Sequence, residues 1–306
     1  MIVDCHTHIW ERDAPLGLDR LESVIAADPK DGGNGREARA DASVEQHLIA
    51  GKPVDRSFVL GFKSRFLGTE IPAELIVKSV RANPDRLIGF AGIDPTDLQE
   101  ALDDLMQAHA EVGIEGITVS PAAQDFHPAD SRAMQVFAEA AKLQMPLLLD
   151  QGVHFTTASK MSFAPPVLLD EIARDIPALK MVVAHMGYPW IDECIVLLGR
   201  HSNIYADISG LLHRPWQAFN ALLSAYQYGV MDKLLFGSDF PYGSAATAIE
   251  ALFRLNQLAT GTNLPTIPRQ FLAAIVERDA LGLLGIESSV STTAEKDVAL
   301  LETNET

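Results

Sequence analysis

The sequence holds 306 residues, of which 47% are hydrophobic, and carries a formal net charge of −17. This length is enough for a large core, as two domains or as one α/β barrel of about 250 residues, while the acidic charge disfavours nucleic acid and anionic membranes as partners. No apolar run approaches the roughly 20 residues that span a bilayer, no basic segment precedes an apolar one at the N-terminus, and only two cysteines are present, so we expect a cytoplasmic protein with free thiols and no signal peptide.

Eight short apolar runs are predicted to be β-strands, and each is followed by a helical pattern. The strands are expected at residues 1–5, 56–61, 87–93, 114–119, 146–149, 180–184, 204–208 and 234–237, and the helices at 43–52, 72–82, about 98–106, 131–143, 166–174, 190–199, 215–228, 245–258 and 268–284. Strand–helix alternation implies parallel pairing through right-handed crossovers. The prediction is an α/β fold, a (β/α)8 TIM barrel, with a doubly wound open sheet as the alternative.

This barrel is predicted to form a single domain over residues 1–286, with an inserted loop at about 11–43. Residues 287–306 form a polar C-terminal tail that we expect to be disordered.

Five polar residues fall where predicted strands end, which is where barrel active sites lie. They are His6, His8, Asp150, His185 and Asp239. His6 and His8 are two residues apart on a strand, so their side chains should point to the same face. Two imidazoles that point the same way are half of a metal site.

The motifs at these strand ends resemble those of the amidohydrolase superfamily, in its amidohydrolase-related branch. That branch is similar to aminocarboxymuconate-semialdehyde decarboxylase and includes hydrolases, decarboxylases and hydratases. The resemblance covers residues 1 to about 286 and rests on His6-x-His8 after the first strand, Val183-Ala184-His185-Met186-Gly187 at the sixth, Asn203-Ile204-Tyr205-Ala206-Asp207-Ile208-Ser209-Gly210 at the seventh and Phe236-Gly237-Ser238-Asp239-Phe240-Pro241 at the eighth.

The fifth strand departs from the family pattern, which usually places a histidine where this chain has Asp150. A ligand set of His6, His8, Asp150 and Asp239 would suit Zn²⁺ first and Mn²⁺ second, with Mn²⁺ favoured by additional oxygen donors. Two further arrangements stay open: Asp150 orients a ligand histidine without binding the ion, or His154 takes the ligand position.

The resemblance also implies roles for the remaining residues. Asp239 would bind the metal and move a proton, and His185 would polarise the substrate or act as general acid, with a purely structural hydrogen-bonding role as its alternative. By their position on loops around the mouth, further residues are candidates for binding a substrate carboxylate, although each by itself is more typical of a solvated loop charge. The first candidates are Arg65, His127, His154 and Arg214, with Lys63 and His213 beside them.

The expected function is that of a metal-dependent hydrolase acting on a small organic acid, lactone or amide, with the bound ion as Lewis acid. A non-oxidative decarboxylase of the same branch uses nearly the same groups. A metal-free lactonase is also compatible with these motifs, and so is a degenerate barrel that only binds ligands. The expected partner is a small molecule, and the candidate cations on the mouth loops indicate that it bears a carboxylate. A homo-oligomer is a further option because barrels of this branch often pair through outer helices.

Overall fold

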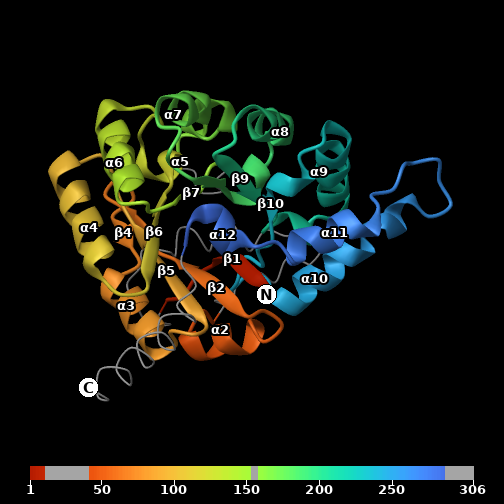
Figure 1. Cartoon of the computed structure of the whole chain (residues 1–306), viewed down its shortest axis with the longest axis horizontal. Coiled ribbons are helices and arrows are strands. Elements are labelled where there is room, and N and C mark those ends of the chain that lie inside the picture. The colour runs from red at the N-terminus through yellow and green to blue at the C-terminus, as the bar shows by residue number, and fades with distance from the viewer. Residues whose placement is uncertain (11–40, 153–157, 287–306) are drawn as a thin grey trace, which may run out of the picture.

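The structure is a computed structural model that describes residues 1–10, 41–152 and 158–286. Its centre is a sheet of eight parallel strands that are neighbours in the order β1-β2-β5-β6-β7-β8-β9-β10, with helices around them (Figure 1). The strands are β1 (Val3–Thr7), β2 (Arg56–Leu60), β5 (Leu87–Gly92), β6 (Ile114–Val119), β7 (Leu147–Leu149), β8 (Met181–Val183), β9 (Ile204–Asp207) and β10 (Leu234–Leu235). The predicted (β/α)8 barrel is confirmed.

The sheet closes where the segment after β10 runs beside β1. The backbone N–H of Cys5 donates to the carbonyl of Phe236 at 2.9 Å, and that of Asp239 donates to the carbonyl of His6 at 3.0 Å. A parallel bridge between Thr7 and Phe240 extends this pairing. The first and last motifs of the chain therefore meet at one point on the barrel mouth.

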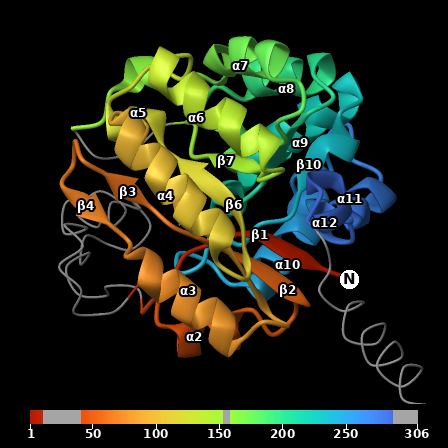
Figure 2. The same cartoon turned by 60° about the vertical axis from the view of Figure 1, so that its left-hand side comes forward.

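The helices that follow these strands surround the sheet. They are α2 (Val44–Ala50), α3 (Ala73–Ala82), α4 (Leu98–Ala110), α5 (Pro121–Gln124), α6 (Ser131–Lys142), α7 (Asp170–Asp175), α8 (Ile191–Arg200), α9 (Pro215–Tyr228), α10 (Ala245–Arg254), α11 (Arg269–Val276) and α12 (Ala280–Leu284). Ser43 begins α2 as predicted, since its hydroxyl accepts from the backbone N–H of Gln46 at 3.4 Å. Figure 2 shows α4 lying along α6, and these two helices are in contact.

Apolar side chains cover both faces of the strands, which explains why the strands read as continuous apolar runs. Phe58 and Phe90, with ring centroids 4.7 Å apart, belong to the cluster inside the barrel, whereas Val59 packs with the larger cluster beneath the helices. Leu281 and Leu284 of α12 join the inner cluster, and Figure 1 shows α12 in the middle of the circle formed by the other helices. The inside of the barrel is a packed core, so chemistry is confined to its mouth.

The structure differs from the sequence prediction at several element boundaries: β1 extends to Thr7, and α10 ends at Arg254. The short helix α5 after β6 was not predicted. Two further differences concern a loop and a helix. The loop after β2 contains a short antiparallel hairpin of β3 (Lys63–Ser64) and β4 (Thr69–Glu70). The helix expected over 268–284 is two helices, because Asp279 caps a new one by accepting from the backbone N–H of Gly282 at 3.0 Å. Most of the insertion expected at 11–43, and the tail expected at 287–306, lie outside the described residues, so both stay predictions.

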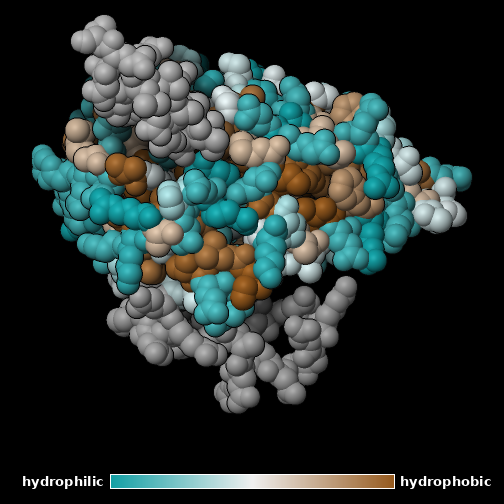
Figure 3. Space-filling model, turned by 60° about the horizontal axis from the view of Figure 1, so that its bottom comes forward, coloured by the Kyte–Doolittle hydropathy of each residue, from teal (hydrophilic) through white to brown (hydrophobic). Residues whose placement is uncertain are grey.

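The described surface is polar over much of its area. On the face drawn in Figure 3, hydrophilic residues cover most of the described surface, and hydrophobic residues gather in patches between them. Among the helices of the described ranges, none has both the length and the apolar character needed to cross a membrane.

Candidate metal centre

The two histidines of the first motif leave β1 on one side. Their Nε2 atoms are 3.2 Å apart, and their rings meet edge to face with centroids 5.1 Å apart. The intervening Thr7 is engaged elsewhere: its hydroxyl donates to the carbonyl of Phe58 at 2.5 Å and accepts from His47 Nε2 at 2.8 Å. Strand alternation thus separates the imidazole pair from the threonine, as the spacing of two indicates.

Asp239 reaches the same point from the segment after β10. Its side-chain Oδ1 lies 3.9 Å from His6 Nε2, and its backbone has φ 62°, in the left-handed region that non-glycine residues seldom adopt. Gly237 permits this approach, because a Cβ on it would lie 2.9 Å from Ser209 Cβ and 3.0 Å from His6 Cβ. A side chain at position 237 would push the aspartate segment away from β1.

The residues fit a divalent ion. His6, His8 and Asp239 each offer one ligand atom, and these atoms all lie within 4.8 Å of one another. Two nitrogens bound at about 2.0–2.1 Å to a tetrahedral ion are separated by about 3.3–3.4 Å, and the two Nε2 atoms here are 3.2 Å apart. Two imidazoles and one carboxylate form a donor set for Zn²⁺ or Mn²⁺.

His185 lies beside this trio on the turn that ends β8. Its ring centroid is 4.6 Å from that of His6, and its backbone has φ 53°. Its Nδ1 is 2.8 Å from both the carbonyl and the hydroxyl oxygen of Ser209. Because a carbonyl only accepts, Nδ1 carries the proton, and Nε2 is the nitrogen left for other partners.

Asp207 is a residue of this site to which the sequence analysis gave no role. It ends β9, is fully buried, and its Oδ2 lies 3.0 Å from His6 Nδ1. Burial alone would raise the pKa of Asp207, but the charge and hydrogen bond of His6, with smaller contributions from His185 and Ser209, hold it below its ordinary value. The available signal in the sequence was a carboxylate at the end of a barrel strand.

The two imidazoles of the first motif have opposite pKa shifts. Burial lowers the pKa of His6, but the charges of Asp207 and Asp239 outweigh burial and raise it to about 9. Burial, and then the charge of His6, lower the pKa of His8 to about 4. At neutral pH and without metal, His6 Nε2–H therefore donates to His8 Nε2, and His8 Nδ1–H donates to the carbonyl of Leu60 at 3.3 Å.

Asp150 is near the centre, although neither group of clustered ligand atoms in the described residues includes it; the two groups are His6, His8 and Asp239, and His6, His185 and Asp207. Asp150 is half-buried at the end of β7, and Ser120 Oγ donates to its Oδ2 at 3.4 Å. Its charge adds a small contribution to the raised pKa of His6 and opposes, without overcoming, the lowering of the pKa of His8 by burial and by His6. Its role as a ligand therefore stays a prediction, while its electrostatic influence on the histidines is evident.

Arg214 lies at the rim of the site. Its Nη1 donates to the carbonyl of Gly210 at 3.1 Å, and its guanidinium stacks over the ring of Tyr188 at 5.3 Å. A Cβ on Gly210 would lie 3.0 Å from His185 Nδ1 and 3.2 Å from Asp239 Oδ2. Arg214 is thus attached to the residue that borders both groups.

Arg65 and His127 have other contacts. Arg65 Nη1 pairs with Asp97 at 2.9 Å and Glu100 at 2.7 Å, and the arginine side chain is 50% exposed. His127 is exposed, and its Nδ1 accepts from the backbone N–H of Ala129 at 3.1 Å. These contacts do not join either residue to the candidate metal centre. The fourth candidate for carboxylate binding, His154, lies outside the described residues.

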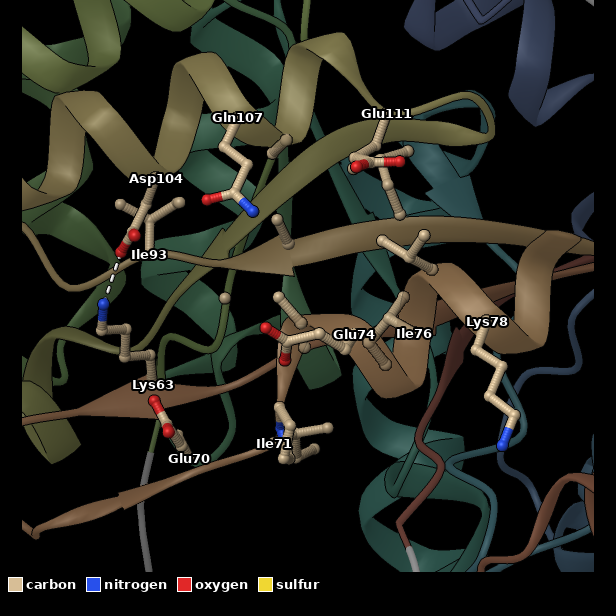
Figure 4. Close-up of a pocket in the computed structure, with 18 of the residues that line it drawn as sticks. Lys63, Glu70, Ile71, Glu74, Ile76, Lys78, Ile93, Asp104, Gln107 and Glu111 are labelled. Atoms are coloured by element: carbon tan, nitrogen blue, oxygen red, sulfur yellow. Dashed lines mark hydrogen bonds and ion pairs between the residues drawn. The ribbon is translucent and has the colours of Figure 1, made fainter.

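A hollow of about 620 Å³ lies elsewhere, between α3 and α4 on the outside of the barrel (Figure 4). Its wall includes Lys63, whose Nζ is 2.5 Å from Asp104 Oδ2, and Arg81, which pairs with Glu111. None of the candidate ligands lines this hollow. Its polar groups include two ion pairs, and we assign it no part in the chemistry of the barrel mouth.

Comparisons with known proteins establish the family and the fold of the chain. The family model described as Amidohydrolase (Amidohydro_2) matches residues 3–286. Among curated proteins, none matches this sequence. One similar solved structure is a probable 2-pyrone-4,6-dicarboxylic acid hydrolase from Acinetobacter baumannii, with 18% identity over 93% of this chain and 99% of that chain and a TM-score of 0.59.

Two further solved structures contain a metal. A dihydroxybenzoic acid decarboxylase from Polaromonas sp. JS666 with bound manganese is 14% identical over 95% of this chain and 98% of that chain, with a TM-score of 0.64. An amidohydrolase from Burkholderia multivorans with bound zinc is 13% identical over 94% of this chain and all of that chain (100%), with a TM-score of 0.66. At these identities the likeness establishes the fold, and the family model, which spans nearly the whole chain, establishes the family. The chain belongs to the amidohydrolase family of enzymes.

Proposed function

We propose that this enzyme is a metal-dependent hydrolase that acts on a small organic acid, lactone or amide. The observation that carries the proposal is the convergence of His6, His8 and Asp239 within ligand distance of one another, with His185 against His6. A divalent ion, Zn²⁺ first and Mn²⁺ second, would supply Lewis-acid polarisation of the reacting carbonyl and a more acidic water. Asp150 is the additional ligand we propose, because a second carboxylate would help to balance the charge of the ion.

The protein groups divide the proton chemistry between them. Asp239 is the proposed base that takes a proton from the attacking water, and its side chain is 15% exposed, which is consistent with access of water. His185 holds its Nδ1 proton against Ser209, so only its doubly protonated form has an Nε2–H, which would donate to the substrate oxygen or to the leaving group. The proton that Asp239 takes from water would then restore the Nε2–H.

Arg214 is our first choice for binding a substrate carboxylate. Its attachment to Gly210 and Tyr188 holds the guanidinium between the segments that follow β8 and β9, and a guanidinium can bind a carboxylate through two parallel hydrogen bonds. Arg65 is a weaker choice because it already pairs with two carboxylates of the α4 region, and His127 and His154 stay predictions.

The second candidate function is non-oxidative decarboxylation, which would begin with proton transfer to a carbon of the substrate and end with loss of CO₂. The fold similarity to the manganese-containing dihydroxybenzoic acid decarboxylase supports it. A cytoplasmic location and a homo-oligomeric state are further proposals that follow from composition and family resemblance.

The metal is tested first. Protein purified without a metal-affinity step is analysed by plasma mass spectrometry, and about one Zn²⁺ or Mn²⁺ per chain is expected. His8→Ala should lose most of this metal, whereas His109→Ala, which changes an exposed histidine on α4, should keep it. A folded wild-type protein without metal, whose activity survives chelation, would favour the metal-free lactonase instead.

The reaction is tested with two substrates at once. A carboxylated lactone such as 2-pyrone-4,6-dicarboxylic acid and a dihydroxybenzoic acid are incubated with the metal-loaded enzyme, and ring opening and CO₂ release are measured separately. Ring opening that is lost in Asp239→Asn supports the hydrolase. Release of CO₂ without any hydrolysed product would contradict the hydrolase and favour the decarboxylase. A folded, metal-loaded protein that turns over no compound in a wider substrate panel would favour a barrel that only binds ligands.

A further inference from the structure

Asp207 connects two strands of the candidate site through its two carboxylate oxygens. Oδ2 faces His6 Nδ1 at 3.0 Å. Oδ1 accepts from the backbone N–H of His185 at 3.1 Å, from the backbone N–H of Ser209 at 3.0 Å and from the Ser209 hydroxyl. The side chain is fully buried, so these partners hold it in one position.

The contact with His6 determines which ring nitrogen can bind a metal. A carboxylate only accepts hydrogen bonds, so the proton of the pair lies on His6 Nδ1. The other nitrogen, Nε2, is the one that faces His8 Nε2 and Asp239. An imidazole that donates one N–H to a carboxylate is fixed in both tautomer and ring orientation.

The contacts of Oδ1 act on His185. Its backbone N–H is bound in a turn where φ is 53°, in the left-handed region that a residue with a Cβ seldom adopts. Because the Ser209 hydroxyl gives its proton to Asp207, its oxygen is available to accept from His185 Nδ1 at 2.8 Å. The orientation of the second imidazole thus depends on the same carboxylate.

We propose that Asp207 is a positioning residue that sets the tautomer of His6, so that Nε2 is offered to the metal, and at the same time fixes the turn that presents His185. This inference deepens the proposed function and rests on it for the identity of the bound group. Asp207 itself does not bind the ion in this arrangement.

The test is Asp207→Asn, which keeps the size of the side chain. Its amide oxygen can still accept from the backbone of His185 and Ser209, but its amide nitrogen donates to His6 Nδ1 and places the ring proton on Nε2. We expect the affinity for Zn²⁺, measured by competition with a chromogenic chelator, to fall about 10–100-fold. In ¹⁵N spectra of the metal-free protein, recorded at a pH that keeps the ring neutral, the His6 proton should move from Nδ1 to Nε2.

The matched control is Asp4→Asn. Asp4 is also a buried carboxylate, and its Oδ1 accepts from the backbone N–H groups of His6 at 3.3 Å and Ser238 at 2.8 Å, without touching a ring. This variant should keep the wild-type tautomer of His6 and the wild-type zinc affinity, although its stability can change. An equal loss of affinity in both variants would mean that any buried charge near the strand matters, and the proposal would fall.

Other outcomes separate this proposal from the proposed function. If wild-type protein binds no metal, the proposed function fails, while the ¹⁵N spectra still test the tautomer. A wild-type His6 that carries its proton on Nε2 overturns the positioning role, and this measurement does not depend on whether Asp207→Asn folds. Two ions per wild-type chain, one of them lost in Asp207→Asn, would instead make Asp207 a ligand.

Discussion

Gly210→Ala is expected to damage the site more than it damages the fold. Gly210 has φ +68°, and an alanine there costs roughly 1–2 kcal/mol in backbone strain. In a large domain, each kcal/mol of lost stability lowers Tm by about 2–4 °C. In addition, the new Cβ would lie 3.0 Å from His185 Nδ1 and 3.2 Å from Asp239 Oδ2, so one of these groups must shift by a few tenths of an ångström.

Because a misplacement of 1 Å can cost about 100-fold in rate, we expect a loss of about 10-fold in kcat/KM, together with weaker zinc binding. Gly229→Ala is the matched control, since Gly229 has φ +85° and a Cβ on it would meet nothing within 4 Å. Thermal unfolding, chelator competition and kinetics are measured for both variants. Similar losses of Tm with a loss of metal affinity only in Gly210→Ala support the reasoning, and equal effects on affinity and rate in the two variants would refute it.

Three further outcomes are expected. Zinc affinity should rise about 10-fold per pH unit from pH 7 towards pH 9 and then level off, because the pKa of His6 is raised to about 9 and the ring proton competes with the metal until it is lost. Burial lowers the pKa of His47 to about 4, so as pH falls from 6.5 the unfolded chain binds this proton before the folded protein does. Up to about 3 kcal/mol of stability is therefore lost by pH 4. Denaturant unfolding of His47→Gln should show a smaller loss over that range. Arg214→Ala should raise KM for a carboxylate substrate about 10-fold or more with a smaller change in kcat, whereas an unchanged KM would place the carboxylate elsewhere.

The barrel could be predicted because its strands obey a rule that acts within each strand. A strand covered on both faces must be apolar throughout, and that pattern is visible without knowledge of its neighbours. The break between α11 and α12 could not be predicted in the same way. Glu277, Arg278 and Asp279 are compatible with a helix, and only the capping of Gly282 by Asp279 shows where the second helix begins.

The residues of the candidate site also differ in how far the sequence alone points to them. His6, His8 and Asp239 were identifiable because position at a strand end and the family motif both point to them. Asp207 was given no role, although it lies in the motif of the seventh strand, because an aspartate near a strand end also suits a turn or a cap, and its partner His6 is 201 residues away in the sequence. Arg65 is the reverse case, a residue that the sequence suggested for substrate binding and that the structure shows in other contacts. A cation on a mouth loop suggests substrate binding, but acidic groups of the α4 region pair with Arg65.

The charge of the site sets a condition on its substrate. The whole chain carries −17, so its long-range field does not attract an organic acid. Asp150 and Asp239 add negative charge at the mouth, and the charged His6 is already paired with Asp207. A carboxylate-bearing substrate therefore depends on positive charge placed locally, and the sources we propose are the bound ion and Arg214. Metal binding and substrate binding should for this reason be coupled, with the substrate carboxylate held more tightly once the ion is in place.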